Sequence, residues 1–482
     1  MFNPKLIIRT IGFLLMVESI FMLFPVMTAI LYGEPVLEDL CTGILVTGGV
    51  GGLFFFSCRK VEKKISKNDG FIIVSLIWIL FALFGSLPYL LTGTIPNFTN
   101  AFFESISGFT TTGASILSNF EQIPRSILLW RSLTQWMGGM GIIVLGMAVL
   151  PIFGIGGMEL FTADIPRPTA ETTKFKLKQT VFNLWFIYIG ITLLEILLLW
   201  LGPMNLYDAI NHSFTTISSG GFSTHKDSIA HWNSPYIEYV ISFFMLIAGI
   251  NLPLIYAAFK GKFAKLFRNE ELKYYLLFII AATAIVYSGI LMFTSTGFGK
   301  AFRESIFQVI AIISTTGFTT VNYSGWPLYL LLFMFMLFFM GACSGSTGGG
   351  MKVMRILLLL KNGYYEVRRS LHPSAVIPVR LNRKAVSDEI ITNVLAFLMI
   401  YLFIFFISTL LFTFMNLDIT AAMGTAASAL GNIGPGIKAT NPTESYAQLP
   451  VIGKWLFSFL MLLGRLELFT ILVLFSPSFW KE

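Results

Sequence analysis

Thr111-Thr112-Gly113-Ala114 is the first of four similar short segments that decide how this chain folds, and it follows the moderately apolar stretch Ala101–Phe109. The other three are Ser219-Gly220-Gly221-Phe222, Thr315-Thr316-Gly317-Phe318 and Asn432-Ile433-Gly434-Pro435. Their central glycines are 108, 96 and 117 residues apart, about one unit of an internal repeat. Nine residues before these glycines lie Glu104, His212, Gln308 and Thr425, in stretches shorter than the roughly 20 residues that a spanning helix needs. Each unit therefore predicts a membrane span, a re-entrant half-helix, an extended glycine segment and a second span.

The composition places the chain in a membrane. Of its 482 residues, 55% are hydrophobic and only 12% are charged, and the mean hydropathy is +0.76. Two of the long apolar runs precede the repeats, and the others flank the four half-helices in pairs. The ten predicted spans are residues 10–32, 37–57, 71–92, 126–151, 181–202, 236–259, 274–294, 327–342, 390–415 and 454–475.

The net charge of +8 indicates membrane topology rather than nucleic-acid binding, because the basic residues flank the spans instead of gathering on one soluble domain. Lys and Arg cluster in alternate connections, at residues 59–67, 167–178, 260–273 and 368–384. The opposite connections hold few cations: Lys226, Lys300, Arg303 and Lys438. The positive-inside rule therefore predicts that the basic loops and both termini are cytoplasmic, and that the four glycine segments open to the outside.

Four glycine segments in register, each after a half-helix, are typical of an ion pore. A dehydrated potassium ion needs oxygen ligands in place of its water shell, and a ring of backbone carbonyls can supply them. Glycine permits left-handed backbone conformations that turn successive carbonyls the same way, and the C-terminal end of each half-helix adds partial negative charge. One such glycine would be explained by close helix packing in a membrane. Four in register favour a pore.

These features resemble the Trk/Ktr/HKT superfamily of potassium transporters, and within it the bacterial TrkH-type membrane subunits. The resemblance covers nearly the whole chain and implies an all-α polytopic membrane protein with four pseudo-repeated membrane-pore-membrane units around one pore, plus two extra N-terminal transmembrane helices. Glycine in the first segment, where some sodium-carrying plant relatives have serine, favours potassium. The implied potassium-binding selectivity filter consists of Thr111, Thr112, Gly113, Ser219, Gly220, Gly221, Thr315, Thr316, Gly317, Asn432, Ile433 and Gly434.

The repeats divide the chain into five parts. We expect two N-terminal transmembrane helices in residues 1–69, and pore repeats at 70–178, 179–272, 273–384 and 385–482.

The eighth predicted span is interrupted at residues 341–350, which contain too many glycines and hydroxyls for an unbroken helix. The resemblance implies an intramembrane gating loop here, with Gly345, Gly348, Gly349 and Gly350 as gating residues. The alternative is a kinked helix whose glycines only ease packing. A phosphate-binding P-loop is excluded because Lys352 comes one place late and Val353 replaces the required hydroxyl residue.

Arg465 lies inside the last apolar run, where a charge is costly and usually faces a cavity or a partner. The resemblance implies a second gating element, an electrostatic barrier below the filter. The alternative is an ion pair with Glu195 or Glu104. Glu104 could instead hydrogen-bond to the backbone of the first filter segment. Arg125 and Arg131, at the outer end of a span, are expected to snorkel or anchor that span.

The resemblance also implies partners and a location. TrkH-type subunits form homodimers in the bacterial inner membrane and work with a cytosolic TrkA-type ring that binds nucleotides and controls opening. The basic loops could contact that ring or anionic lipid head groups. The expected function is potassium uptake through a channel-like pore, with no cofactor held by this chain. Symport coupled to H⁺ or Na⁺, or less selective K⁺/Na⁺ transport, remains the alternative, and an enzyme is disfavoured because the spans contain no catalytic motif.

Overall fold

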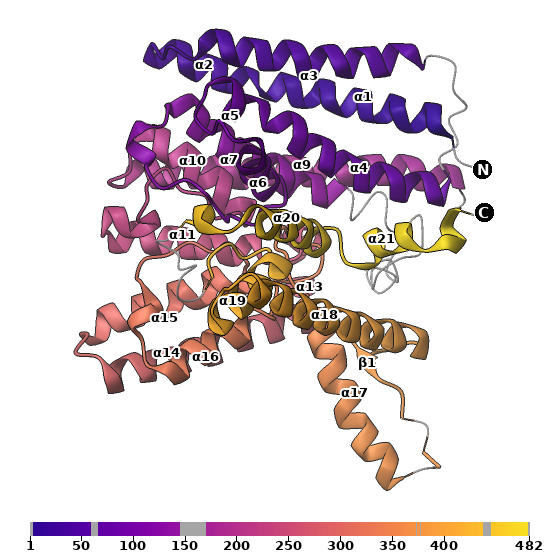
Figure 1. Ribbon diagram of the computed structural model, residues 1–482. Coiled ribbons are helices and arrows are strands. Elements are labelled where there is room, and N and C mark those ends of the chain that lie inside the picture. The colour runs from indigo at the N-terminus through magenta and orange to yellow at the C-terminus, as the bar shows by residue number, and fades with distance from the viewer. Residues whose placement is uncertain are drawn as a thin grey trace.

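The computed structural model describes residues 3–58, 66–144, 170–372, 374–375, 377–436 and 445–480. Its first two spans are α1 (Pro4–Phe21), continued by α2 (Leu23–Tyr32), and α3 (Leu37–Ser57). Figure 1 shows these helices lying along one another at one edge of the molecule. They approach closely because a Cβ on Gly51 would lie 2.9 Å from the backbone oxygen of Gly12.

Four half-helices follow, each packed between the spans that flank it. They are α6 (Phe98–Phe109), α10 (Leu206–Ile217), α15 (Phe298–Ile313) and α19 (Ile419–Gly431). The flanking helices are α4 (Lys67–Gly85) and α7 (Arg125–Val144), α9 (Ala170–Leu201) and α11 (Pro235–Ala248), α14 (Glu270–Phe293) and α16 (Leu328–Leu337), and α18 (Asp388–Phe414) and α20 (Val451–Arg465). The first two half-helices begin at asparagine caps, because Asn97 and Asn205 each accept a hydrogen bond from the amide three residues later.

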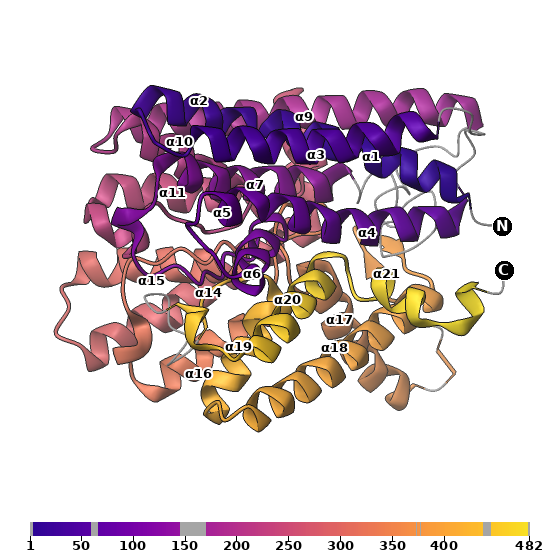
Figure 2. The ribbon, with the colours of Figure 1, turned by 45° about the horizontal axis from the view of Figure 1, so that its top comes forward.

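Shorter elements join these helices. They are α5 (Leu87–Leu91), α12 (Leu252–Phe259), α13 (Phe263–Arg268), α21 (Phe469–Leu472), the antiparallel strands β1 (Arg380–Leu381) and β2 (Lys384–Ala385), and the 3-10 turns η1 (Phe120–Gln122), η4 (Ser228–Trp232), η5 (Tyr323–Gly325), η7 (Tyr446–Gln448), η8 (Val473–Phe475) and η9 (Pro477–Trp480). The start of α1 and η9 lie at the same end of the bundle in both Figure 1 and Figure 2.

The predicted spans are confirmed in part. Within the described residues, six helices or nearly straight helix pairs are long and apolar enough to cross a membrane. The unbroken spans predicted at 236–259 and 454–475 are wrong, because α11 and α12 bend by 103° and α20 and the segment Phe469–Phe475 bend by 109°. The two remaining predictions correspond to α7, which is described as far as Val144, and to the ten-residue helix α16.

The eighth span is interrupted, as predicted. Helix α16 ends at Leu337, an irregular loop follows, and α17 (Val353–Leu371) begins beyond it. We call residues 338–352 the interrupting loop. In Figure 1, α17 leaves the bundle and extends away from the other helices. Asn382, in the turn between β1 and β2, accepts a hydrogen bond from the Glu270 amide, so this hairpin is attached to the start of α14.

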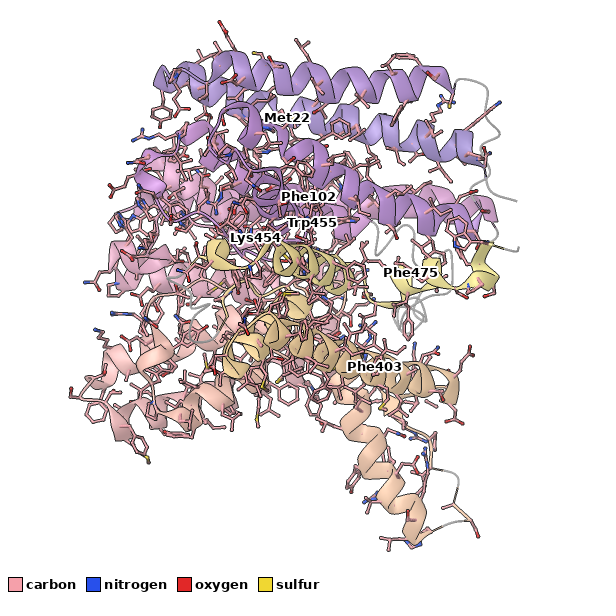
Figure 3. All side chains as sticks on the ribbon, viewed as in Figure 1. Met22, Phe102, Phe403, Lys454, Trp455 and Phe475 are labelled. Atoms are coloured by element: carbon pink, nitrogen blue, oxygen red, sulfur yellow. The ribbon has the colours of Figure 1, made fainter. Side chains whose placement is uncertain are left out.

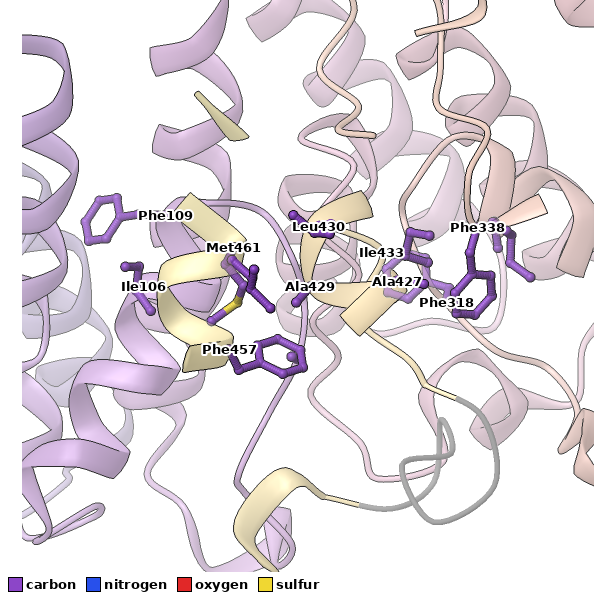
Figure 4. Packing of buried hydrophobic residues seen from close by; sticks show 14 of the residues in the cluster. Ile106, Phe109, Phe318, Phe338, Ala427, Ala429, Leu430, Ile433, Phe457 and Met461 are labelled. Carbon is purple, nitrogen blue, oxygen red and sulfur yellow. The ribbon is translucent and has the colours of Figure 1, made fainter. Parts of the chain in front are cut away.

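Apolar side chains fill the centre and also coat the outside, as expected for a protein in lipid. Figure 4 shows Leu430 and Ile433 of the fourth unit between Met461 of α20 and Phe338 of the third unit. Phe403 and Phe475, labelled in Figure 3, are 66% and 69% exposed. This outer coat is where a lipid bilayer would contact the protein.

Candidate functional site

Each half-helix ends in the same backbone turn, which places its glycine segment. The residue two places before the central glycine has a positive φ: 51° at Thr111, 56° at Ser219, 60° at Thr315 and 51° at Asn432. The glycines themselves have φ values of 81°, 75°, 77° and 99°. The next amide returns to the half-helix, for example from Thr112 to the Ser107 oxygen at 2.9 Å and from Thr316 to the Ala311 oxygen at 2.9 Å. The left-handed backbone predicted at the glycines is confirmed, and such conformations strongly favour glycine.

The four segments close into a ring. A Cβ on each central glycine would meet the carbonyl oxygen of the residue just before the central glycine of the next unit. These contacts run from Gly113 to the Gly220 oxygen at 2.1 Å, from Gly221 to Thr316 at 1.9 Å, from Gly317 to Ile433 at 1.9 Å, and from Gly434 back to Thr112 at 2.5 Å. The order passes through the four units and returns to the first. We call this arrangement the glycine ring; any side chain at these glycines would collide with a neighbouring backbone carbonyl.

Side chains from the half-helices support the segments that follow the glycine ring. Glu104 accepts hydrogen bonds from the Ile116 amide at 2.9 Å and the Ser115 hydroxyl at 2.8 Å, so its backbone bond is made two residues beyond the filter segment for which it was predicted. His212 Nε2 bonds to Ser223 Oγ at 3.0 Å, and Gln308 Nε2 donates to Thr320 Oγ1 at 3.3 Å. The fourth equivalent, Thr425, has no hydroxyl partner within the described part of the chain. In three of the units, therefore, a side chain at the same position of the half-helix makes an equivalent supporting hydrogen bond, although the residue type differs each time.

Helix α7 joins the first two units, in a way that the sequence did not reveal. Arg131 is 1% exposed, its Nε lies 2.8 Å from Glu104 Oε1, and its Nη1 donates to the Ser223 oxygen at 3.1 Å. Of the two roles predicted for Arg131, snorkelling is therefore wrong, and the side chain instead ties α7 to its neighbours inside the protein. Gln135 donates to the Gly220 oxygen at 2.7 Å and accepts from the Phe222 amide at 3.0 Å. Arg125 is exposed, and its guanidinium stacks on Tyr32 at 4.4 Å, as an anchoring residue would.

A cavity of about 510 Å³, which we call the mouth cavity, opens on the side of the ring toward which the glycine segments lead. All four central glycines line it, together with Arg131, His225, Lys226 and Tyr446 among others. The four segments therefore reach one common aqueous space. A hydrated cation in this space would meet the glycine ring directly.

The interrupting loop covers the other side of the ring, where the half-helices end. Thr347 Oγ1 lies 2.9 Å from Ser219 Oγ, and the Gly349 amide donates to Thr315 Oγ1 at 2.7 Å. A Cβ on Gly349 would lie 2.7 Å from the Cβ of Asn432. The loop thus contacts three of the four segments. Gly345 and Gly350 have positive φ values of 73° and 65°, and a Cβ on Gly348 would lie 2.9 Å from the Ser314 oxygen.

Arg465 fixes the loop at this position. It is 3% exposed, and its Nη1 donates to the Thr347 oxygen at 2.7 Å while its Nη2 donates to the Gly138 oxygen at 3.1 Å. The alternative of an ion pair with Glu104 or Glu195 is wrong. Glu104 pairs with Arg131, and the Glu195 carboxylate has no hydrogen-bond partner among the described residues. The guanidinium therefore places a positive charge beside the loop, below the ring.

The arrangement has the parts that a cation site needs. A backbone carbonyl from each of the four units lies in the ring that the cavity reaches, and carbonyl oxygens can replace the water around a dehydrated cation. On the other side of the ring, the loop is packed against Ser219 and Thr315, and the Arg465 guanidinium lies beside it. All twelve residues predicted for the filter are therefore in the four ring segments, and the five predicted gating residues lie in the loop or beside it.

Known proteins share this sequence and this fold. The sequence pattern of the TrkH family, described as a cation transport protein, matches residues 38–482. The Trk system potassium uptake protein TrkH of Halomonas elongata is 38% identical over 483 residues, and that of Escherichia coli K12 is 37% identical over 486; each comparison covers 99% of both chains. The crystal structure of the potassium transporter TrkH from Vibrio parahaemolyticus matches with a TM-score of 0.92 and 35% identity, covering 99% of this chain and 100% of that one. The chain therefore belongs to the TrkH family of cation transport proteins.

Proposed function

We propose that this chain forms a potassium-selective pore through which K⁺ enters the cell across the inner membrane of a bacterium. The closed glycine ring carries this proposal, because each unit gives a glycine and an adjoining carbonyl to one point. The relatives that match over the whole chain are Trk system potassium uptake proteins. The names of these relatives and the chemistry of the ring support the same transported ion.

In this proposal, K⁺ loses its water in the mouth cavity and is coordinated by backbone carbonyls of the twelve ring residues. Four glycines keep the ring open to the ion, since a side chain there would occupy the space beside a carbonyl. The half-helix ends add partial negative charge toward the same point. Membrane voltage is enough to drive uptake, because it supplies about 2.3 kcal/mol per charge per 100 mV.

The interrupting loop and Arg465 are the proposed gate. The loop contacts the ring on the side away from the cavity, and Arg465 holds the Thr347 carbonyl from α20. Gly345, Gly348, Gly349 and Gly350 allow the tight backbone that fits under the ring. A cation could pass only after the loop moves, so the described conformation corresponds to a closed pore.

The charge pattern supports the proposed orientation and partners. Basic residues such as Lys260, Lys262, Lys265 and Arg268 gather at α13, and few cations occur in the connections on the ring side. The ring then faces outward, and the termini and α13 face the cytoplasm. There a TrkA-type nucleotide-binding ring would control the gate, and the membrane subunit would pair as a homodimer.

The test is uptake of labelled rubidium or potassium into liposomes that contain the purified chain alone or with a TrkA-type ring. We expect uptake that follows an imposed voltage, is reduced by excess potassium and is little changed by excess sodium. Uptake that equally follows a pH gradient at fixed voltage would favour symport instead. Equal competition by sodium and potassium would contradict the selective ring.

A further inference from the structure

The interrupting loop has a narrow neck whose two arms are held by their own backbone. The Gly341 amide donates to the Met351 oxygen at 2.8 Å, and the Val353 amide donates to the Ala342 oxygen at 3.2 Å. The loop between them reaches the glycine ring. Moving it away from the ring therefore requires the neck to shift or to separate.

Glu271, in the first turn of α14, contacts both sides of this neck. Glu271 is fully buried. Its Oε1 accepts hydrogen bonds from the Ser344 amide at 2.7 Å and the Met354 amide at 3.2 Å. Ser344 lies on the arm that enters the loop. Met354 lies in the first turn of α17, the helix that follows the loop. Its second oxygen, Oε2, has no hydrogen-bond partner among the described residues.

We propose that Glu271 is the clasp that holds the gating loop closed, a positioning residue for the gate; this rests on the gating role proposed above for the loop. A single oxygen of Glu271 accepts from both amides, so the two arms are held together through one atom. If the neck moved while Glu271 stayed buried, the carboxylate would lose its partners, which is costly away from water. The closed position is favoured for as long as both amides reach the same oxygen.

The contacts that Asn251 and Leu252 make with the neck hold only one arm. Asn251 Nδ2 donates to the Ser344 oxygen at 2.6 Å, and the Leu252 amide donates to the Gly345 oxygen at 3.2 Å, both on the entering arm. Among these neighbours, Glu271 alone joins the entering arm to the start of α17. Its position, rather than its charge alone, distinguishes it from the other supports.

The same turn of α14 is tied to the part of α17 that leaves the bundle. Glu270, the preceding residue, pairs with Lys361 Nζ at 2.5 Å, and Lys361 also donates to the Arg380 oxygen at 2.9 Å. Figure 1 shows α17 extending away from the other helices. A displacement of α17 would therefore be passed to the turn that carries the clasp, and from there to the neck.

The experiment is unstimulated rubidium uptake into liposomes that contain the full chain, compared among Glu271→Ala, Glu271→Asp and Glu271→Gln. Alanine removes the acceptor, and aspartate keeps the charge but withdraws it by one methylene. Glutamine keeps an oxygen at the same reach. We expect alanine and aspartate to raise unstimulated uptake about tenfold, the scale of leaving one buried amide without its acceptor. Glutamine should stay within about twofold of the parent chain.

Glu238→Ala is the matched control. Glu238 is a 4% exposed acid in the first turn of α11, and it pairs with Arg303 of α15 rather than with the loop. We expect its uptake to equal that of the parent chain. Thermal unfolding of every variant in detergent shows whether it is folded, and the aspartate variant carries the test if the alanine variant is not.

Deleting Ser344–Gly350 separates the two proposals. If the deletion raises uptake but neither Glu271→Ala nor Glu271→Asp does, the clasp is overturned and the gate stands. If the deletion also leaves uptake low, the gating role of the loop fails, and the clasp with it. Uptake raised equally by Glu271→Gln would overturn the clasp too, because the effect would then come from charge and not from reach.

Discussion

At the residue scale, Gly113 carries the clearest prediction. Its φ is 81°, and a Cβ there would lie 2.1 Å from the Gly220 oxygen of the next unit. We expect Gly113→Ser to displace that carbonyl and reduce the preference for potassium over sodium by about tenfold, or ~1.4 kcal/mol. The measurement is rubidium uptake in competition with each ion.

A matched control separates the collision from backbone strain. Gly261 has a φ of 74°, and a Cβ there would have nothing within 4 Å. Gly261→Ser imposes the same left-handed strain on a side chain but leaves the ring intact, so its selectivity should equal that of the parent chain. Unchanged selectivity in Gly113→Ser would defeat the filter assignment.

Arg131 and Glu104 give a second prediction, concerning stability. Both side chains are buried, and Arg131 also holds the Ser223 oxygen of the second unit. Arg131→Ala leaves the Glu104 carboxylate buried without its cation, which typically costs about 3–5 kcal/mol. We expect a large fall in the unfolding temperature in detergent. The double variant Arg131→Ala with Glu104→Gln should regain part of it, and an unchanged single variant would show that the pair is not buried as described.

At the element scale, the structure confirms the half-helices and corrects two of the spans. The repeat spacing of the glycine segments and the length of the apolar stretches before them were enough to predict the four half-helices α6, α10, α15 and α19. The 103° bend between α11 and α12 was missed because hydropathy continues through it. The signal was local: Gly249 ends one helix, and Asn251 caps the next and is followed two places later by proline.

Arg131 and Gln135 could not be placed from the sequence, because their partners are up to 92 residues away.

The loop and Arg465 give a third prediction at this scale. Arg465→Ala removes the donor to the Thr347 oxygen and the positive charge beside the path. We therefore expect unstimulated rubidium uptake to rise, by about tenfold or more, equal to ~1.4 kcal/mol. Arg125→Ala is the comparison, since Arg125 is an exposed arginine that stacks on Tyr32. Uptake that fell in Arg465→Ala, with the protein still folded, would contradict a barrier role.

The turn η4 provides a prediction of pH dependence. His231 stacks on His225 with ring centroids 3.7 Å apart, and burial together with the neighbouring His225 lowers the pKa of His231. Near and below pH 6.5, the ordinary pKa of histidine in the unfolded chain, the folded state therefore binds fewer protons at His231 than the unfolded chain does. The stability that His231 contributes is thus complete above about pH 6.5 and is lost as the pH falls below it. The unfolding temperature should fall more in the parent chain than in His231→Gln between about pH 7.5 and about pH 5.5. An equal fall of the unfolding temperature in the parent chain and in His231→Gln would contradict the lowered pKa of His231.

At the scale of the whole molecule, fourfold recurrence made the architecture predictable. Glycine segments at similar spacing predicted one pore shared by four units, and the ring contacts from Gly113 through Gly434 agree with that. What the sequence could not give is how the units are joined. The Arg131 link between units one and two, and the contact of the loop with units two, three and four, depend on three-dimensional closure. Neither leaves a periodic signal in the chain.

Dependence on a partner is the fifth prediction, and it belongs to the whole molecule. In the proposed gate, the loop, Arg465 and Glu271 together hold the pore closed, so the chain alone is predicted to take up rubidium slowly. Addition of a nucleotide-loaded TrkA-type ring should raise uptake, and deletion of Ser344–Gly350 should make uptake independent of that ring. Fast uptake by the unaltered chain alone, unaffected by the ring, would show that the described conformation is not closed.

The most direct test of the proposal that the glycine ring binds potassium is to locate the ion. Thallium, which replaces potassium in such sites, can be found by anomalous scattering from crystals of the full chain grown with thallium or rubidium. We predict a strong peak at the centre of the glycine ring, within coordinating distance of carbonyl oxygens from all four units, that weakens when excess potassium is added. A peak that persists in potassium, or an empty ring with the ion bound elsewhere, would contradict the account.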